Sequence, residues 1–216
     1  MVGMAGAQVT GVVLAGGKGS RMAGEQAHKA LLDVGGRSIV GRVIDSLAMV
    51  LDDVVIVAND PVPFARFGVR VVPDRADLSG MSGPMTGVVS GLTDAGRDCF
   101  VAACDMPFIE PKLVAFLVGL REGYDLVVPT TGGRPEPLFG VYRMAALPAL
   151  ERALKGGTRS LQEVFASLSV RYVDEEELRA HDPELLSFIN VNTPQDLARA
   201  REILLARDAV EGRRLL

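Results

Sequence analysis

The chain has little of what a disulfide framework or a nucleic-acid surface requires. Its 216 residues include two cysteines, and the formal net charge is −4. Cys99 and Cys104 lie in or beside one apolar run, and at that spacing on a strand they point to opposite faces, so they cannot bridge each other. We expect two buried apolar thiols. The acidic balance provides no basic field for nucleic acid, so an anionic ligand must be held by a few local positive groups.

The sequence also lacks membrane and export signals. No run reaches the roughly 18–20 apolar residues of a membrane helix. The segment 1–8 has no positively charged start and is predicted to be a loose leader rather than a signal peptide. We therefore expect a cytoplasmic protein without a membrane partner. The length fits a single domain over 1–216, with a frayed tail at 207–216.

Short apolar runs alternate with segments of helical spacing along the chain. The predicted strands are 9–14, 54–58, 69–72, 100–103, 126–128, 138–142 and 170–173. The predicted helices are 38–50, 84 to about 92, 111–120, 145–154, 161–168 and 193 to about 206. This alternation predicts an α/β fold with a Rossmann-like, mostly parallel sheet and helices on both faces, in three layers.

A glycine-rich segment follows the first predicted strand. It reads Leu-Ala-Gly-Gly-Lys-Gly-Ser-Arg-Met from Leu14 to Met22, and Lys29 comes after it. Backbone N–H groups of such a turn can surround phosphate oxygens, while Arg21 and Lys29 add positive charge. The third glycine of a dinucleotide fingerprint is missing, and no Gly-Lys-Ser/Thr closes a Walker loop. The segment predicts a triphosphate site; the alternative is a tight turn with solvated cations.

The motif Cys-Asp-Met-Pro places Asp105 at the end of another apolar strand. Ligands of doubly wound sheets bind beyond the carboxyl ends of strands, so this carboxylate would share a crevice with the glycine loop. A carboxylate among phosphates is the usual way to hold Mg²⁺. The sequence therefore predicts Asp105 as a magnesium ligand; the alternative is an aspartate that starts a turn before Pro107.

Two further segments are expected to border the same crevice. Gly83 and Gly87 flank a predicted helix start and allow close backbone approach to a ligand. Asn190 and Asn192 share one face of a predicted strand end just before a helix, where they can bind an anion or orient a phosphate. The alternatives are an ordinary helix start at the first segment and a turn beside the Thr193 cap at the second.

These motifs occur in an order that is found in one family. After the glycine-rich segment come a lysine, Gly-Pro-Met-Thr-Gly, Cys-Asp-Met-Pro, Glu-Pro-Leu-Phe-Gly-Val-Tyr and Asn-Val-Asn-Thr-Pro. The whole set spans the chain from about Val9 to about Arg201. The chain resembles the MobA-like nucleotidyltransferases, and within them the molybdenum cofactor guanylyltransferases. The resemblance implies a nucleotide-diphospho-sugar transferase-like fold. It also implies Mg²⁺-dependent transfer of GMP from GTP to a molybdopterin-type cofactor with release of pyrophosphate, and molybdoenzyme apoproteins or their chaperones as recipients of the product.

The resemblance also assigns roles to individual residues. It gives to GTP the residues Leu14, Ala15, Gly16, Arg21, Lys29, Asn59 and Asp74. It implies that Asp105 binds the metal, and that Asn190 and Asn192 lie on the side of the site where the pterin substrate binds. With Gly17, Gly83 and Gly87 these complete the predicted nucleotide site, in which Lys29, Arg21 and Asp105 are the expected catalytic groups. One departure from the family pattern is a loop two residues longer between Arg21 and Lys29, with His28 in the place of an aspartate.

The expected chemistry needs no protein base, because the attacking phosphate oxygen is already ionised. Catalysis then rests on positioning and charge neutralisation. Guanine presents N1–H and N2–H₂ side by side, and Asp74 or the backbone of 80–83 could accept both, whereas cytosine has no such donor pair. The alternative is that Asp74 only orders the turn after Pro73.

Three other kinds of function are compatible with parts of this pattern. A molybdopterin cytidylyltransferase or a sugar-phosphate nucleotidyltransferase would share the crevice, but cytidylyl relatives tend to carry Leu-Ala-Ala-Gly, and this chain has Leu-Ala-Gly-Gly. A non-catalytic protein that hands the cofactor to an apoenzyme would keep the nucleotide site and release no pyrophosphate. A Rossmann dehydrogenase is disfavoured by the missing third glycine.

Overall fold

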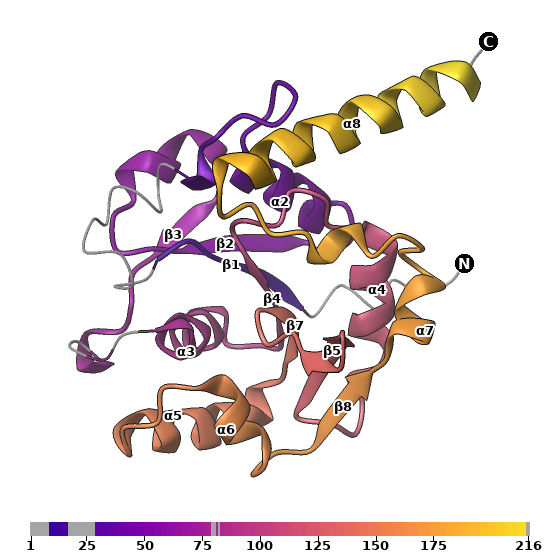
Figure 1. Ribbon diagram of the computed structural model, residues 1–216. Coiled ribbons are helices and arrows are strands. Elements are labelled where there is room, and N and C mark those ends of the chain that lie inside the picture. The colour runs from indigo at the N-terminus through magenta and orange to yellow at the C-terminus, as the bar shows by residue number, and fades with distance from the viewer. Residues whose placement is uncertain (1–8, 17–28, 79–80, 82, 215–216) are drawn as a thin grey trace.

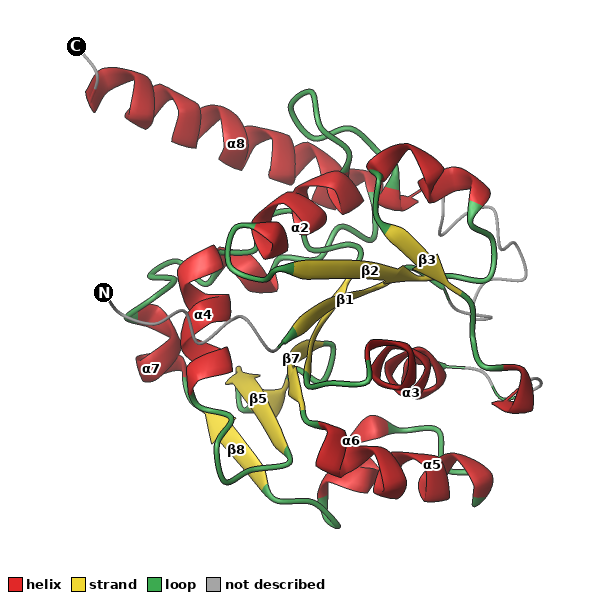
Figure 2. Cartoon of the chain, turned by 180° about the vertical axis from the view of Figure 1, so that it is seen from behind, coloured by secondary structure: helices red, strands yellow, loops and turns green. Residues whose placement is uncertain are grey.

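The computed structural model describes residues 9–16, 29–78, 81 and 83–214, with the backbone alone for 208–214. One sheet of eight strands with helices on both faces forms the described chain (Figures 1 and 2). The strands are β1 (Thr10–Leu14), β2 (Asp53–Val57), β3 (Arg70–Val72), β4 (Cys99–Ala103), β5 (Leu126–Thr131), β6 (Arg134–Pro135), β7 (Phe139–Tyr142) and β8 (Val170–Val173). The α-helices are α2 (Ile39–Ala48), α3 (Pro84–Ala95), α4 (Pro111–Gly119), α5 (Leu147–Lys155), α6 (Leu161–Phe165), α7 (Glu175–Arg179) and α8 (Pro194–Arg214). Short 3₁₀ turns are η1 (Val62–Phe67), η2 (Ala76–Leu78), η3 (Met144–Ala146) and η4 (Leu186–Phe188).

Two strands of the sheet, β7 and the two-residue β6, run antiparallel to their neighbours. Its order is β3-β2-β1-β4-β7-β5-β6, with β8 also paired to β5. The strands β3, β2, β1 and β4 are parallel neighbours, whereas β7 is antiparallel to both β4 and β5. The connection from β5 to β7 contains no helix, and such a connection brings the chain back in the opposite direction. The prediction of a mostly parallel sheet between helices is confirmed.

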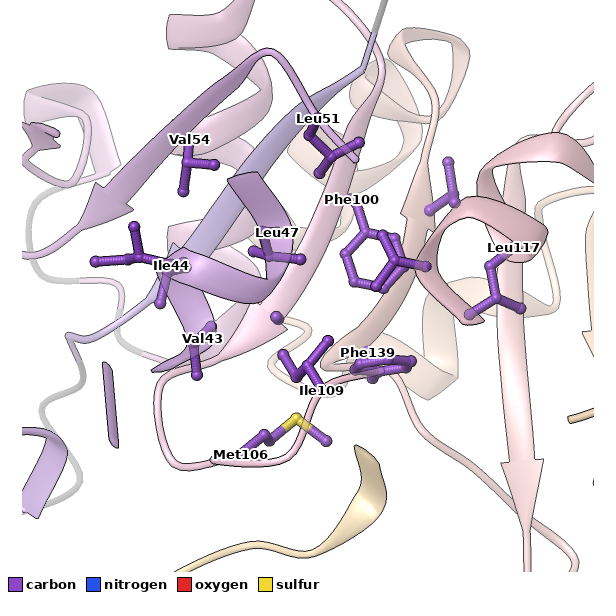
Figure 3. Close-up of a cluster of buried hydrophobic side chains, with 14 of the residues drawn as sticks. Val43, Ile44, Leu47, Leu51, Val54, Phe100, Met106, Ile109, Leu117 and Phe139 are labelled. Atoms are coloured by element: carbon purple, nitrogen blue, oxygen red, sulfur yellow. The ribbon is translucent and has the colours of Figure 1, made fainter. Parts of the chain in front are cut away.

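Alternate residues of the central strands enter two separate cores. On one face, Val13 and Ile56 pack with α2 and α4, and Figure 3 shows Phe100 near Leu47 of α2 and Phe139 beside Ile109 in this cluster. Their rings lie edge to face, with 5.0 Å between centroids. On the other face, the second core contains residues of β1, β2, α3, α5 and α6. The strands are thus covered on both sides, as their continuous apolar sequences predict.

Several boundaries differ from the sequence-based expectations. Helix α8 extends to Arg214, beyond the end predicted near Ala206, and its last turns project away from the sheet (Figures 1 and 2). Alanine, leucine, arginine and glutamate favour helix in this stretch, and no residue stops it near 206. The helix α7 and the two-residue strand β6 were not predicted. The predicted leader 1–8 lies outside the described residues.

Two predictions about composition can be compared with the structure. Both cysteines are free; Cys99 is buried in β4, whereas Cys104 is only half-buried. Burial raises the pKa of the Cys104 thiol to about 12. Within the described ranges, none of the helices is both long enough and apolar enough to span a bilayer.

Helix α8 packs on the bend between Lys29 and α2. Gly35 in this bend has φ +64°, and a Cβ there would lie 2.0 Å from Cδ2 of Leu204 in α8. We expect Gly35→Ala to lower the free energy of unfolding in urea by about 2–3 kcal/mol, because backbone strain and overpacking add.

The neighbouring glycine provides a matched control. Gly36 has φ +78°, but a Cβ there would meet nothing within 4 Å. Gly36→Ala should therefore cost only the backbone strain, about 1 kcal/mol. Equal losses in the two variants would show that α8 does not press on the bend.

Candidate functional site

The first glycine turn and Asp105 leave the sheet at the same edge. Leu14 at the end of β1 is the register partner of Ala103 at the end of the parallel strand β4. The amide of Cys104 donates to the carbonyl of Leu14 at 3.2 Å, which extends the pairing by one residue. The structure therefore brings together the two segments that the sequence predicted to share a crevice.

Gly16 passes close to the end of β2. The amide of Ala15 donates to the carbonyl of Val57 at 3.0 Å. A Cβ on Gly16 would lie 3.4 Å from the Cα of Ala58 and 3.5 Å from the carbonyl oxygen of Val57. The turn thus runs beside the sheet edge, at a distance where a Cβ would make ordinary van der Waals contact. The candidates Gly17 and Arg21 lie outside the described residues.

Asp105 is half-buried, and one of its carboxylate oxygens is left without a partner. Its Oδ1 is buried and has no hydrogen-bond partner among the described residues. Burial raises the pKa of this carboxyl, and the positive charge of the exposed Lys29 acts in the opposite direction. The charge of Lys29 therefore acts on Asp105. The next residue, Met106, is buried in the core beneath the site, which anchors the loop (Figure 3).

The donors at this place fit a magnesium ion. A buried carboxylate oxygen without a partner carries a desolvation cost that a cation or a donor would relieve. Within the described ranges, no three His, Cys, Asp or Glu side chains cluster as a metal cage. Magnesium commonly uses one or two carboxylates together with substrate phosphates and water. Asp105 is therefore the described side chain suited to hold Mg²⁺ jointly with a triphosphate.

Asn59 and Asp74 are paired at the ends of β2 and β3. Nδ2 of Asn59 donates to Oδ2 of Asp74 at 2.8 Å, and the amide of Asp74 donates to Oδ1 of Asn59 at 2.9 Å. Asn59 is exposed and Asp74 is half-buried. The pair leaves lone pairs on the Asp74 carboxylate available to a ligand.

The Asn190–Asn192 segment lies directly against the loop that carries Asp105. The amide of Val191 donates to the carbonyl of Asp105 at 2.9 Å. Val191 is buried, and the asparagines on either side of it are exposed. The segment follows the turn η4 rather than the predicted strand end, which is a correction; the apolar residues before it enter a core under α8 instead of a sheet.

The start of α8 is capped as the sequence predicted. The amide of Asp196 donates to Oγ1 of Thr193 at 3.1 Å, and Oδ2 of Asp196 accepts from the amides of Asn192 and Thr193. These bonds lower the pKa of the Asp196 carboxyl, and the bond from the Asn192 amide has the largest effect. The cap fixes the backbone of Asn192 next to Val191, which contacts the Asp105 loop.

The two glycines of the α3 segment differ in their surroundings. Gly83 caps the N-terminus of α3 with φ +130°, a conformation that favours glycine. Gly87 is buried, and a Cβ there would lie 3.0 Å from Cδ2 of Leu14. Gly87 thus allows α3 to lie close to β1, which is a packing role whether or not a nucleotide also approaches the helix.

Sequence reasoning missed the residue that follows Asp74. The Arg75 side chain bonds to Asp77, Thr93 and Glu151, and its amide donates to Ser90. An arginine in a loop gives no local signal of such partners, since Glu151 is 76 positions away along the chain.

An arrangement of this kind defines a class of protein, in which an α/β fold binds a nucleotide across the carboxyl ends of parallel strands. The MobA-like NTP transferase domain matches residues 11–173, and the chain belongs to this family. A probable molybdenum cofactor guanylyltransferase of Pelotomaculum thermopropionicum is 40% identical over 207 residues, which cover 95% of this chain and 97% of that one.

Solved structures agree with this assignment. Molybdopterin-guanine dinucleotide biosynthesis protein A from Archaeoglobus fulgidus superposes with a TM-score of 0.77 at 32% identity, over 92% of this chain and all of that one. The 4-diphosphocytidyl-2C-methyl-D-erythritol synthase from Anaerococcus prevotii has a TM-score of 0.68 at 13% identity, over 93% of this chain and 99% of that one. The second likeness shows the shared fold alone.

Proposed function

We propose that this nucleotidyltransferase is a molybdenum cofactor guanylyltransferase, which transfers GMP from GTP to the phosphate of a molybdopterin-type cofactor. The observation that carries the proposal is the buried Oδ1 of Asp105, which has no hydrogen-bond partner among the described residues and lies at the same sheet edge as the Gly16 turn. The guanylyltransferase name of the Pelotomaculum relative, which matches nearly the whole chain, supports the choice of substrates. Molybdoenzyme apoproteins or their chaperones would then receive the product.

The candidate groups follow the sheet edge in an order that suits the two substrates. Asn59 and Asp74 lie at the ends of β2 and β3, Gly16 follows β1, and Asp105 follows β4. Three strand spacings, about 14 Å, separate β3 from β4. A guanine at Asp74 would place its phosphates near Gly16 and Asp105, and the acceptor would approach from Asn190.

The reaction forms one P–O bond and breaks another. A phosphate oxygen of the acceptor attacks the α-phosphorus of GTP, and pyrophosphate leaves with the bonding electron pair, so no proton has to be removed. Magnesium, when bound at Asp105, would supply neutralisation of the triphosphate charge. Lys29 would stabilise the charge that develops on pyrophosphate, and Asn190 and Asn192 would orient the acceptor phosphate. Arg21 and the backbone of Gly17 would bind the triphosphate from the glycine-rich loop.

Guanine selection by Asp74 is tested by comparing nucleotides. In thermal unfolding with Mg²⁺, GTP at 100 times its Kd should stabilise the protein by about 2.7 kcal/mol, and CTP, ATP and UTP at the same concentration should stabilise it less. Asp74→Asn should remove most of this preference. A carboxylate can accept one hydrogen bond on each of its two oxygens, whereas an amide has only one accepting oxygen and its nitrogen donates. Asp52→Asn, an exposed change outside the candidate site, is the control.

Pyrophosphate release tests the catalytic part of the proposal. Purified protein should release pyrophosphate from GTP with Mg²⁺ only when the molybdopterin-type acceptor is present. Binding of GTP without any release would instead fit a protein that handles the cofactor without catalysis. Equal release with CTP and GTP would contradict guanine selection.

A further inference from the structure

The turn after β3 is attached to the sheet through Asp74. Asn59 contacts this residue twice, once at its carboxylate and once at its amide. These bonds set the position of the carboxylate relative to the end of β2. They do not hold the rest of the turn, which continues into η2.

The backbone of the next residue is attached to α3. The amide of Arg75 donates to Oγ of Ser90 at 3.0 Å. Ser90 is buried, and its own hydroxyl donates to the carbonyl of Thr86 at 2.9 Å, so its lone pairs are directed towards Arg75. The turn therefore has a fixed point on α3, the helix that lies against β1.

The Arg75 side chain extends this attachment to two helices. Its Nε and Nη2 bond to the Asp77 carboxylate at 3.0 and 2.7 Å, and Nη1 bonds to Oγ1 of Thr93 on α3 at 3.1 Å. Nη1 also contacts Oε1 of Glu151 on α5. The side chains of Arg75 and Glu151 are only about a quarter exposed, at 25% and 26%, so water screens their ion pair less than a surface pair.

The guanidinium group is occupied by the protein itself. Four of its contacts reach described residues, and an arginine has five N–H donors. Hydrogen bonds to these partners raise the pKa of Arg75, and the bond to Asp77 has the largest effect. A group held in this way cannot turn to a nucleotide without breaking several charge-assisted bonds. The side chain is therefore placed to hold the turn rather than to contact a substrate.

We propose that Arg75 and Glu151 are positioning residues, which hold Asp74 in the orientation that accepts both donors of guanine. This inference rests on the proposed guanylyltransferase function. A carboxylate that is fixed before binding loses less conformational freedom when it receives the base. Loosening the turn should thus weaken recognition of guanine without changing the groups around the phosphates.

The test compares GTP with ITP, whose base lacks the 2-amino group and offers Asp74 one donor fewer. We expect Arg75→Gln to raise the KM for GTP about tenfold and to change kcat by less than about twofold. The KM for ITP should rise less, so the preference for GTP falls. Glu151→Gln should change the preference in the same direction by about threefold, and Arg75→Lys should recover part of it.

Arg70→Gln is the matched control. Arg70 lies on β3 and also bonds to two carboxylates, those of Asp53 and Asp94, but its side chain is 54% exposed and it does not touch the Asp74 turn. This variant should keep the wild-type ratio of GTP to ITP activity. A loss of selectivity in Arg70→Gln equal to that in Arg75→Gln would show a general loss of stability and overturn the inference.

The remaining outcomes separate the inference from the proposed function. If the wild-type protein turns over GTP but does not prefer it to ITP, guanine reading by Asp74 fails, and the inference fails with it. If the wild type prefers GTP and the Arg75→Gln and Glu151→Gln variants keep that preference, the positioning role alone is overturned. A loss confined to Arg75→Gln, with Glu151→Gln unchanged, would mean that Arg75 itself contacts the nucleotide.

Discussion

Replacement of Asp105 by asparagine is expected to lower kcat by about 10²–10³-fold, because the magnesium ion that this carboxylate would hold supplies several kcal/mol of charge stabilisation. The same change should raise the melting temperature of the nucleotide-free protein. Burial raises the pKa of this carboxyl, so the folded state disfavours its ionised form. Asparagine keeps the shape and removes the buried charge. Function and stability are therefore expected to move in opposite directions at this position.

The stability effect has a defined dependence on pH. Because the pKa of Asp105 is raised in the folded state, its contribution to stability is present at low pH and is lost as the pH rises through that pKa. The gain from Asp105→Asn should thus appear at neutral pH and shrink in acid. Pyrophosphate release and thermal unfolding of the same samples measure both effects.

An exposed aspartate outside the candidate site provides the control for this pair of measurements. Asp52→Asn, just before β2, should leave both kcat and the melting temperature near their wild-type values. Near-normal turnover in Asp105→Asn would refute the metal-binding role. A lower melting temperature in that variant would show that the carboxylate is satisfied in the folded protein.

Replacement of Gly140 by alanine is expected to lower the free energy of unfolding by about 2–4 kcal/mol. Gly140 lies in β7 between β4 and β5, and a Cβ there would be 2.5 Å from the carbonyl oxygen of Val127 and 3.5 Å from the Cα of Val128. These atoms belong to the backbone of β5, so no side-chain rotation relieves the contact. The strands would have to separate, which weakens the pairing of β5 with β7.

Urea unfolding measures this effect, and a second glycine controls for the chemistry of the substitution. Gly119 closes α4, is exposed, and has nothing within 4 Å of the Cβ position. Gly119→Ala should be neutral or slightly stabilising, because alanine favours helix more than glycine does. An unchanged midpoint for Gly140→Ala would mean that β5 and β7 lie farther apart than in this structure. The melting temperature should fall on the order of 10 °C if the estimate for Gly140 holds.

Local patterns in the sequence were sufficient for most of the fold. The apolar runs around Val12, Val55 and Val101 each became a strand buried on both faces, and Thr193 caps α8 as expected. The shared edge of the glycine turn and Asp105 follows from the rule that parallel strands present their carboxyl ends together, and the register confirms it. The assignments of individual side chains to GTP, metal and acceptor stay predictions.

Contacts between distant segments could not be predicted in the same way. The reversal of β7 depends on which strand it joins, and its own residues read alike in either direction. The bonds of Arg75 to Ser90 and of Val191 to Asp105 join segments that only the complete fold brings together. The end of α8 was placed too early: no glycine or proline occurs near Ala206, the helix continues through Gly212, and a gradual boundary has little sequence signature.

The bond between the amide of Val191 and the carbonyl of Asp105 uses only main-chain atoms. Any residue except proline at 191 can make it, so it does not restrict the side chains at 190 and 192. Under the proposed function, relatives can therefore exchange those side chains to suit a different second substrate while the Asp105 carboxylate keeps its alignment. A common scaffold that permits such exchange offers a physical route to new transferase specificities during evolution.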